Sequence, residues 1–156
     1  MLMRFLLGLF LLLLPLLLLS ATPQATSPAM DDYSGMYSFL REGEFVQVTV
    51  EDKGNVSGFI SRFGDSETDK NAFLDQFFES GRLDSNHLSF TTKNVHGTWF
   101  TFEGTLGRGA GKRPEDEGYY VIRGTLNRFK TDADKKKTSQ DSRRVEFKSF
   151  PRDVSQ

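Results

Sequence analysis

The feature that most restricts the fold of this chain is a series of short β-branched and aromatic runs that begins after residue 34. Gly, Asp and Asn residues separate the runs, which is the pattern of antiparallel strands joined by tight turns. The chain contains eight such runs: Gly35 to Leu40, Phe45 to Glu51, Val56 to Phe63, Phe77 to Leu83, Leu88 to Asn94, Thr98 to Arg108, Gly118 to Phe129 and Arg143 to Phe150. The sequence therefore predicts an all-β domain.

One stretch departs from this pattern. Between Thr68 and Phe78, apolar residues recur three and four positions apart, as Phe73 and Phe77 do. This spacing is typical of one face of a helix. We therefore expect one short helical segment that leads into the fourth strand.

The turn residues predict the register of two hairpins. A three-residue loop that ends in a left-handed glycine is a common hairpin connection. The loop at 52–54 ends in Gly54 and sets Val46 opposite Ile60. The loop at 95–97 ends in Gly97 and sets Phe90 opposite Phe102. In both hairpins the apolar residues then face the same side.

The sixth and seventh strands are joined by a longer connection, so their register rests on matched faces alone. We expect Phe100 opposite Leu126 and Phe102 opposite Gly124. This register also predicts an ion pair between Glu103 and the outward side chain of residue 123, an arginine. Such a cross-strand pair contributes only ~0.2–1 kcal/mol.

Eight sequential strands with hairpin connections can close on themselves, and closure removes exposed sheet edges. We expect an antiparallel up-and-down eight-stranded barrel. The segment Gly35-Met36-Tyr37 opens the first strand and resembles the glycine-x-aromatic start of the calycins, the lipocalin and avidin type of barrel. The resemblance implies an interior that holds one small, mostly apolar molecule. It also implies that a basic residue near the last strand, Arg143 or Arg144, packs against Tyr37.

A repeated motif accompanies the strands, with glycine, an aliphatic residue two positions on and arginine four positions on. It occurs at Gly58 to Arg62, Gly104 to Arg108 and Gly124 to Arg128. The structural interpretation is that inner-face glycines let coiled strands bend and close. The functional interpretation is that the arginines surround a barrel mouth and bind an anion. In an up-and-down order the first and third arginines reach the same end, and the second reaches the other.

Two states of the barrel interior remain open at this stage. The many phenylalanines expected on the inner face favour a filled interior, and the inner-face glycines favour space for one ligand. A buried Tyr hydroxyl needs a polar partner, which a ligand can supply. The predicted ligand-binding residues are Tyr37, Phe102, Tyr120, Arg62 and Arg128.

Four other aromatic residues alternate with the inner set and face outward: Phe59, Phe63, Trp99 and Tyr119. Either the expected helical segment covers part of this set, or the residues form an interface with a protein partner or a second copy of the chain. Two functions are therefore expected. The first is a non-enzymatic barrel that binds a small apolar or amphipathic ligand in its interior; the alternative is a filled barrel that acts as a protein-interaction or inhibitor module through this outer aromatic face.

The amino terminus predicts export. An apolar run from Phe5 to Leu19 follows Arg4 and precedes a polar stretch, which is the order of parts in a signal peptide. This run is shorter than the ~20 residues of a membrane span, so an uncleaved anchor is the less favoured alternative. The expected organisation is a signal peptide at 1–25, a disordered linker at 26–33, the barrel at 34–151 and a disordered tail at 152–156. The expected location is secreted or periplasmic, with membrane contact only during export.

The remaining chemistry points away from catalysis. The chain has no cysteine, which rules out disulfides and thiolate metal sites, and its formal net charge of −1 gives no general field for nucleic acid. His87 and His96 lie in expected turns, without carboxylates at metal-ligand spacing. We therefore expect no catalytic residues, no metal site, no cofactor and no nucleic-acid partner. Asn55 begins a glycosylation sequon that has meaning only in a eukaryotic host.

Overall fold

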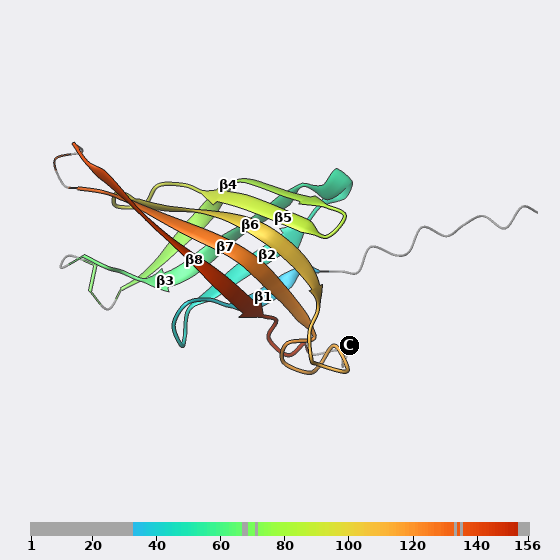
Figure 1. Cartoon of the computed structure of the whole chain (residues 1–156). Coiled ribbons are helices and arrows are strands. Elements are labelled where there is room, and N and C mark those ends of the chain that lie inside the picture. The colour runs from blue at the N-terminus through green and yellow to red at the C-terminus, as the bar shows by residue number, and fades with distance from the viewer. Residues whose placement is uncertain (1–32, 67–68, 71, 133, 135, 153–156) are drawn as a thin grey trace, which may run out of the picture.

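The computed structural model describes residues 33–66, 69–70, 72–132, 134 and 136–152 of the chain. Eight antiparallel strands form one sheet in sequence order (Figure 1). The strands are β1 (Gly35–Ser38), β2 (Phe45–Val50), β3 (Val56–Phe63), β4 (Phe73–Asp84), β5 (His87–Thr92), β6 (Thr98–Arg108), β7 (Tyr120–Thr131) and β8 (Thr138–Lys148). The expected signal peptide, the linker up to residue 32 and the tail from residue 153 lie outside the described residues.

The sheet curls until its first and last strands meet, which confirms the up-and-down barrel. Tyr37 of β1 forms an antiparallel bridge with Ser149, just after β8. Beside it, the amide of Phe150 donates to the carbonyl of Met36 at 2.9 Å, and the amide of Lys148 donates to Ser38 Oγ at 3.0 Å. The two edge strands are thus joined to each other.

Because the strands follow one another up and down, successive connections alternate between the two ends of the barrel. We call one end the mouth; it carries the β1–β2, β3–β4, β5–β6 and β7–β8 connections, on the left in Figure 1. The opposite end carries the β2–β3, β4–β5 and β6–β7 connections together with residues 33–34 and 151–152.

Both hairpin registers predicted from turn chemistry are confirmed. Val46 pairs with Ile60, and Phe90 pairs with Phe102. The turn glycines Gly54 and Gly97 have φ values of 78° and 80°, in the left-handed region that glycine tolerates best. The first turn, Asp52–Gly54, is a short 3₁₀ segment, and no longer helix occurs in the described residues.

The register predicted between β6 and β7 is wrong by two residues. Phe102 pairs with Leu126, and Gly104 pairs with Gly124. A Cβ atom at either glycine would lie within 2.7 Å of Phe102 Cζ, so the paired glycines make room for the Phe102 ring. A shift by two keeps every side chain on its face, so alternation alone does not distinguish the two registers.

The helix predicted over Thr68 to Phe78 is also wrong, because β4 begins at Phe73. Phe73 and Phe77 are both exposed, and Gln76 between them is buried, as expected for a strand. Residues four positions apart share a face in a strand as well as in a helix, so the spacing fits both. None of the helical structure in the described part of the chain is long and apolar enough to span a membrane.

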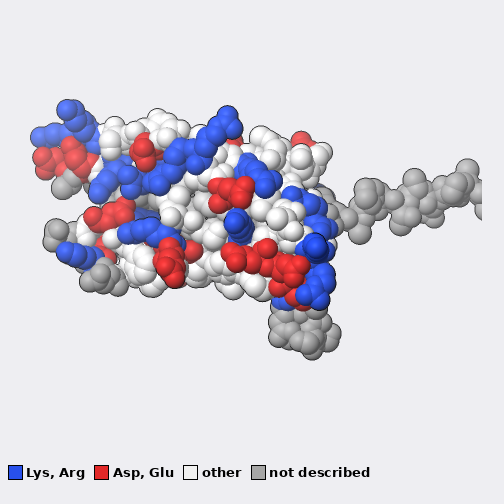
Figure 2. Space-filling view, turned by 60° about the horizontal axis from the view of Figure 1, so that its bottom comes forward, with Lys and Arg blue, Asp and Glu red and all other residues white. Residues whose placement is uncertain are grey.

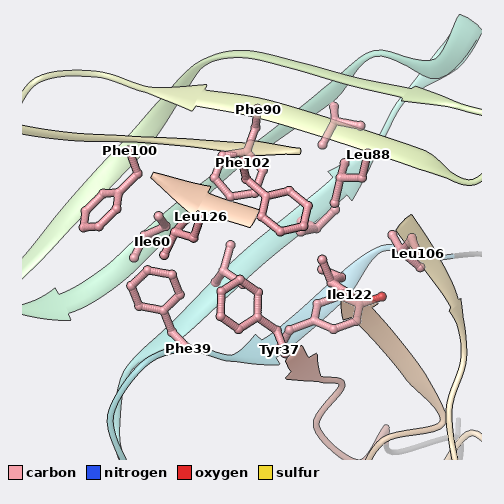
Figure 3. Close-up of a cluster of buried hydrophobic side chains, with 14 of the residues drawn as sticks. Tyr37, Phe39, Ile60, Leu88, Phe90, Phe100, Phe102, Leu106, Ile122 and Leu126 are labelled. Carbon is pink, nitrogen blue, oxygen red and sulfur yellow. The ribbon is translucent and has the colours of Figure 1, made fainter. Parts of the chain in front are cut away.

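Phenylalanine rings fill the barrel interior. Phe90 stacks between Phe78 and Phe102, with ring centroids 4.3 and 5.2 Å apart. Phe39 contacts both Phe100 and Phe147, at 5.8 and 5.2 Å. Figure 3 shows the labelled rings of this group pointing toward one another with Ile60 and Leu126 between the strands. One cleft opens beyond this packing, at the mouth of the barrel.

Candidate functional site: a charged cleft at the mouth

A cleft of about 240 Å³ opens at the mouth, where the packed interior ends. Its apolar wall comes from Phe39, Leu40 and Phe100, and its charged rim from Arg41, Glu44, Arg62, Asp65, Arg128 and Arg143. Acidic and basic side chains are interspersed at this end of the molecule in Figure 2. The cleft thus combines an apolar floor with several guanidinium groups.

Arg62 is the innermost charge of the cleft. It is the last inward residue of β3 and is only 3% exposed. Its Nε donates to Gln76 Oε1 at 2.6 Å, and its Nη1 donates to the carbonyl of Phe63 at 3.1 Å. The guanidinium also lies 5.6 Å from the Phe100 ring centroid. Burial is the main cause that lowers the pKa of Arg62, opposed by the carboxylates of Asp65 and Glu44. An arginine stays charged in proteins even so.

Gln76 fixes the orientation of Arg62. The side chain is fully buried on β4, and its Nε2 donates to the carbonyl of Thr98 at 2.8 Å and to that of Lys93 at 3.1 Å. These bonds leave Oε1 directed at the arginine. An inward glutamine in a strand is costly unless all its polar atoms are paired, as they are here.

Glu44 ties the β1–β2 connection to the end of β3. It is 3% exposed, and its Oε1 accepts from the amide of Phe63 at 3.0 Å and from Arg41 Nε at 2.9 Å. Its Oε2 accepts from the amide of Arg41 at 3.1 Å. This buried carboxylate is therefore largely neutralised by its own neighbours.

Asp65 lies among the arginines of the rim. Its carboxylate is 3.5 Å from Arg62 Nη1, 3.6 Å from Arg128 Nη1 and 3.8 Å from Arg41 Nη2. Further out, Asp141 lies 3.7 Å from both Arg128 and Arg143. The rim thus carries a net positive charge, because four guanidinium groups lie near three carboxylates. The guanidinium groups are those of Arg41, Arg62, Arg128 and Arg143, and the carboxylates are those of Glu44, Asp65 and Asp141.

The structure brings together two of the five predicted ligand-binding residues. Arg62 and Arg128 lie on either side of Asp65, as the strand order predicted. Phe102 lies in the packed core. Tyr37 and Tyr120 are buried toward the opposite end, where the Tyr37 hydroxyl donates to the carbonyl of Tyr33 at 2.6 Å. A ligand role for these three residues stays a prediction.

Two further expectations about arginines can be compared with the structure. Arg108 lies at the opposite end, as predicted, 3.5 Å from the ring centroid of Tyr119. The packing of Arg143 or Arg144 on Tyr37 is wrong: Arg143 lines the cleft, and Arg144 is exposed opposite Thr125. The outward direction of Arg144 and the mouth position of Arg143 follow from the strand register of β8.

Sequence reasoning missed Glu44, Gln76 and Asp65. Glu44 directly precedes one expected strand and Asp65 follows another, and charged residues are ordinary at such places. Gln76 lies in the stretch interpreted as a helix. If this stretch is taken as a strand, Gln76 is a polar residue at an inward position, which was its one signal. The strand itself becomes evident only from the tertiary pairing with β3.

The four predicted interface residues fall into three places. Phe59 and Phe63 lie on the outer face of β3, beside Phe77 and Phe73. Trp99 of β6 stacks on Phe129 of β7 with centroids 5.0 Å apart. Tyr119 lies at the opposite end under Arg108. Their role as an interface stays a prediction.

The described residues contain no group of three or more His or acidic side chains placed to hold a metal ion. His96 pairs its Nδ1 with Asp69 at 2.8 Å, which links the β5–β6 turn to the β3–β4 connection.

The barrel and its mouth define the fold class as a calycin-like barrel of the avidin type, and solved structures bear this out. The chain is similar to the crystal structure of a rhizavidin–biotin complex, with 13% identity, a TM-score of 0.56, and coverage of 78% of this chain and 96% of that one. It is also similar to apo short afifavidin, with 15% identity, a TM-score of 0.53, and coverage of 79% and 97%. The sequence matches no protein-family model, and no curated protein is significantly similar to it. At these identities the likeness shows the fold alone.

Proposed function

We propose that this protein binds a small amphipathic anion at the mouth of its barrel, without catalysing a reaction. The anionic group lies between Arg62 and Arg128, and the apolar part of the ligand lies against Phe39 and Phe100. This ligand class follows from the cleft, which joins an apolar floor to guanidinium groups. Arginine suits a carboxylate because its planar donors match the two oxygens.

The single observation that carries the proposal is the position of Asp65. Its carboxylate lies within 3.6 Å of both Arg62 and Arg128, so a carboxylate fits between these two groups. A buried arginine is expensive to keep, since desolvation of its charge costs several kcal/mol. A filled barrel needs no such residue for its core, which favours a binding role for Arg62.

The size of the cleft limits the ligand. Ligand pockets typically enclose ~300–1,000 Å³, and the volume of about 240 Å³ falls just below that range. The cleft adjoins a wider surface hollow that shares Arg41, Asp65 and Arg128, so this volume limits only the part of the ligand that the cleft encloses. The rhizavidin structure, a complex with biotin, supports a barrel of this fold as the binder of a small molecule.

The test is calorimetric titration of the purified protein with straight-chain carboxylates from acetate to octanoate, and with octanol. We expect affinity to rise with chain length and to fall when octanol replaces octanoate. Arg128→Gln should weaken octanoate binding roughly tenfold or more, because a hydrogen bond to a charged group contributes ~1.5–3 kcal/mol. The matched control is Arg108→Gln, which removes the equivalent arginine at the opposite end.

Two results would count against the proposal. One is the absence of binding for every carboxylate tested. The other is an equal loss of binding in Arg128→Gln and Arg108→Gln, since only the first of these residues lines the cleft.

We also propose that the apolar amino-terminal run directs export and is then removed. The support is the order of its parts, with Arg4 before the apolar run and polar residues after it. Intact-mass analysis of protein recovered from the medium or periplasm checks this. A mature chain that begins at Thr22 or Thr26, after Ala21 or Ala25, is expected, and recovery of the full chain from the cytoplasm alone would contradict it.

A further inference from the structure

The seam that closes the barrel is paired only at one end. Within the described residues, β1 reaches only the end of β8, where Tyr37 bridges to Ser149. After Ser38 the chain turns back toward β2, because the amide of Phe39 donates to the carbonyl of Glu44 at 3.1 Å. In Figure 1, β1 lies beside the arrowhead of β8 and not along its length. Most of this long last strand therefore has a neighbouring strand on one side only.

The hydrogen bonds of β8 show which main-chain groups lie on its unpaired side. In an antiparallel strand, successive residues direct their N–H and C=O groups to opposite edges. The amide of Ser149 donates to Tyr120 on the β7 side, and the amide of Phe150 donates to Met36 on the β1 side, both at 2.9 Å. The pairing of β8 with β7 has no register shift, so the even-numbered residues face away from β7 along the whole strand. We define the free edge as the main-chain groups of Gln140, Ser142, Arg144 and Glu146.

The free edge is open to an additional chain. No main-chain hydrogen bond joins its groups to any described residue, and the four residues that form it are exposed. A row of unpaired N–H and C=O groups of this kind is a template for one more extended strand. The chemistry of the edge therefore specifies an extended peptide backbone as its partner.

The cleft at the mouth lies behind the free edge. Its lining includes Arg143 of β8 on one side, and Phe39 and Leu40 of the β1–β2 connection on the other. A strand added to β8 continues the position of β1, and every second side chain of that strand points inward. Apolar side chains at the inward positions meet the apolar wall of the cleft. The side chains between them stay outside, in the same row as Arg144.

One charge of β8 beside the free edge is unpaired. Asp141 lies 3.7 Å from Arg143, and Glu146 lies 2.7 Å from Arg123, so both carboxylates of this stretch already have a basic partner. Arg144 contacts no carboxylate in the part of the chain that the structure describes. A second copy of β8 would add another unpaired arginine to this outer row. An acidic peptide instead supplies the missing partner.

We propose that the free edge binds an extended acidic peptide of another protein as an added antiparallel strand. The main chain of the peptide pairs with residues 140–146, its acidic side chains lie outside beside Arg144, and its apolar side chains point into the cleft. Antiparallel addition continues the order of the sheet, since β1 itself meets the end of β8 antiparallel. In strand addition of this kind, main-chain hydrogen bonds give affinity and alternate side chains give specificity.

The first test adds a capped peptide of alternating glutamate and valine to the protein purified in the form in which its cells yield it. Amide hydrogen exchange is followed by NMR. The amides of residues 142 and 144 should slow roughly tenfold or more, because a hydrogen-bonded amide exchanges only when its structure opens locally. The amides of residues 143 and 145 face β7 and should change much less. Unchanged exchange at residues 142 and 144 in excess peptide overturns the proposal.

The second test compares two methylated forms of the same peptide. In an antiparallel pair, the residues opposite Arg144 and its even-numbered neighbours exchange their hydrogen bonds across the free edge. These are the glutamates, so their N-methylation should abolish binding. N-methylation of the valines should leave binding largely unchanged, since their N–H groups point away from β8. Equal binding of the two methylated peptides overturns the proposal.

A charge reversal tests the outer row. Arg144→Glu should weaken binding of the unmethylated peptide roughly fivefold or more, because like charges opposite each other destabilise a strand pair. The matched control is Arg82→Glu, which reverses an exposed arginine of β4 and should leave binding unchanged. An equal loss in the two variants would show that net charge, and not the free edge, attracts the peptide.

Other occupants of the edge are recognised in the protein without peptide. A second copy on the edge gives a dimer in sedimentation equilibrium with the amides of residues 142 and 144 already protected. A segment of the same chain gives a monomer with the same protection, and either result overturns the proposal. Octanoate binding is measured separately: if octanoate binds and the peptide does not, only the peptide site is rejected, and the reverse result rejects only the anion site.

Discussion

The two ends of this barrel use the same motif differently. Arg62 and Arg108 each follow a glycine by four positions, yet Arg62 is 3% exposed among polar partners, and Arg108 lies on the surface against Tyr119. The difference comes from the neighbouring connections. At the mouth they supply Glu44 and Asp65; at the opposite end they supply aromatic rings. A local motif thus sets where an arginine points, and its partners decide what it does.

The largest expected effect is on the free energy of unfolding, which should differ between variants of Arg62 and Arg108. Arg62→Met should lower the free energy of unfolding by about 3–5 kcal/mol, because it leaves buried partners, including Gln76 Oε1, without their donor. Arg108→Met should cost about 1 kcal/mol or less, the value of an exposed cation–π contact. Urea denaturation followed by Trp99 fluorescence measures both. Similar losses for the two variants would mean that the ends do not differ as described.

A smaller effect concerns ligand affinity. Asp65→Asn should raise the affinity of the mouth for octanoate roughly tenfold or more, since it removes a carboxylate that competes for Arg62 and Arg128. The control is Asp116→Asn, which changes the same group at the opposite end. Calorimetric titration of both variants compares the two. Weaker binding in Asp65→Asn would show that this carboxylate supports the ligand instead of competing with it.

The smallest effect belongs to the opposite end. Hydrogen bonds from the amides of Arg113 and Lys112 lower the pKa of Asp116 below its usual 3.8. A carboxyl group with a lowered pKa contributes stability above its unfolded pKa and loses it as pH falls through the folded value. The 111–118 connection should therefore loosen below pH 3.8. Titration of the Asp116 side chain by NMR checks this, and a midpoint at or above the usual value would contradict it.

Turn chemistry and face alternation predicted much of the barrel. The registers at Gly54 and Gly97 were correct because a tight turn fixes its own pairing within a few residues. The up-and-down order of the strands placed Arg62 and Arg128 at one end. Face alternation placed Phe59 and Phe63 on the outside, where they lie.

The errors arise where two arrangements share one pattern. Residues four apart lie on one face of a helix or a strand, so Phe73 and Phe77 indicated the wrong element. A register shift of two preserves both faces, so Gly124 was paired with Phe102 in place of Gly104. Pairing with β3 and the volume of the Phe102 ring resolve these two cases, and neither is visible in a single strand.

By itself, the sequence determined the class of fold, the direction of the side chains and the end that each arginine reaches, because these depend on the two-residue period of a strand and on the up-and-down order of the strands. Only the tertiary structure decided what surrounds those side chains. Gln76 and Glu44 reach the neighbourhood of Arg62 only when β4 and β2 pair with β3, and Asp65 reaches it through the turn that follows β3. Closure of the sheet encloses the inward phenylalanines in the interior and leaves the outward phenylalanines of β2–β4 on the surface. The curvature of the barrel limits the volume on its inner side and not on its outer side.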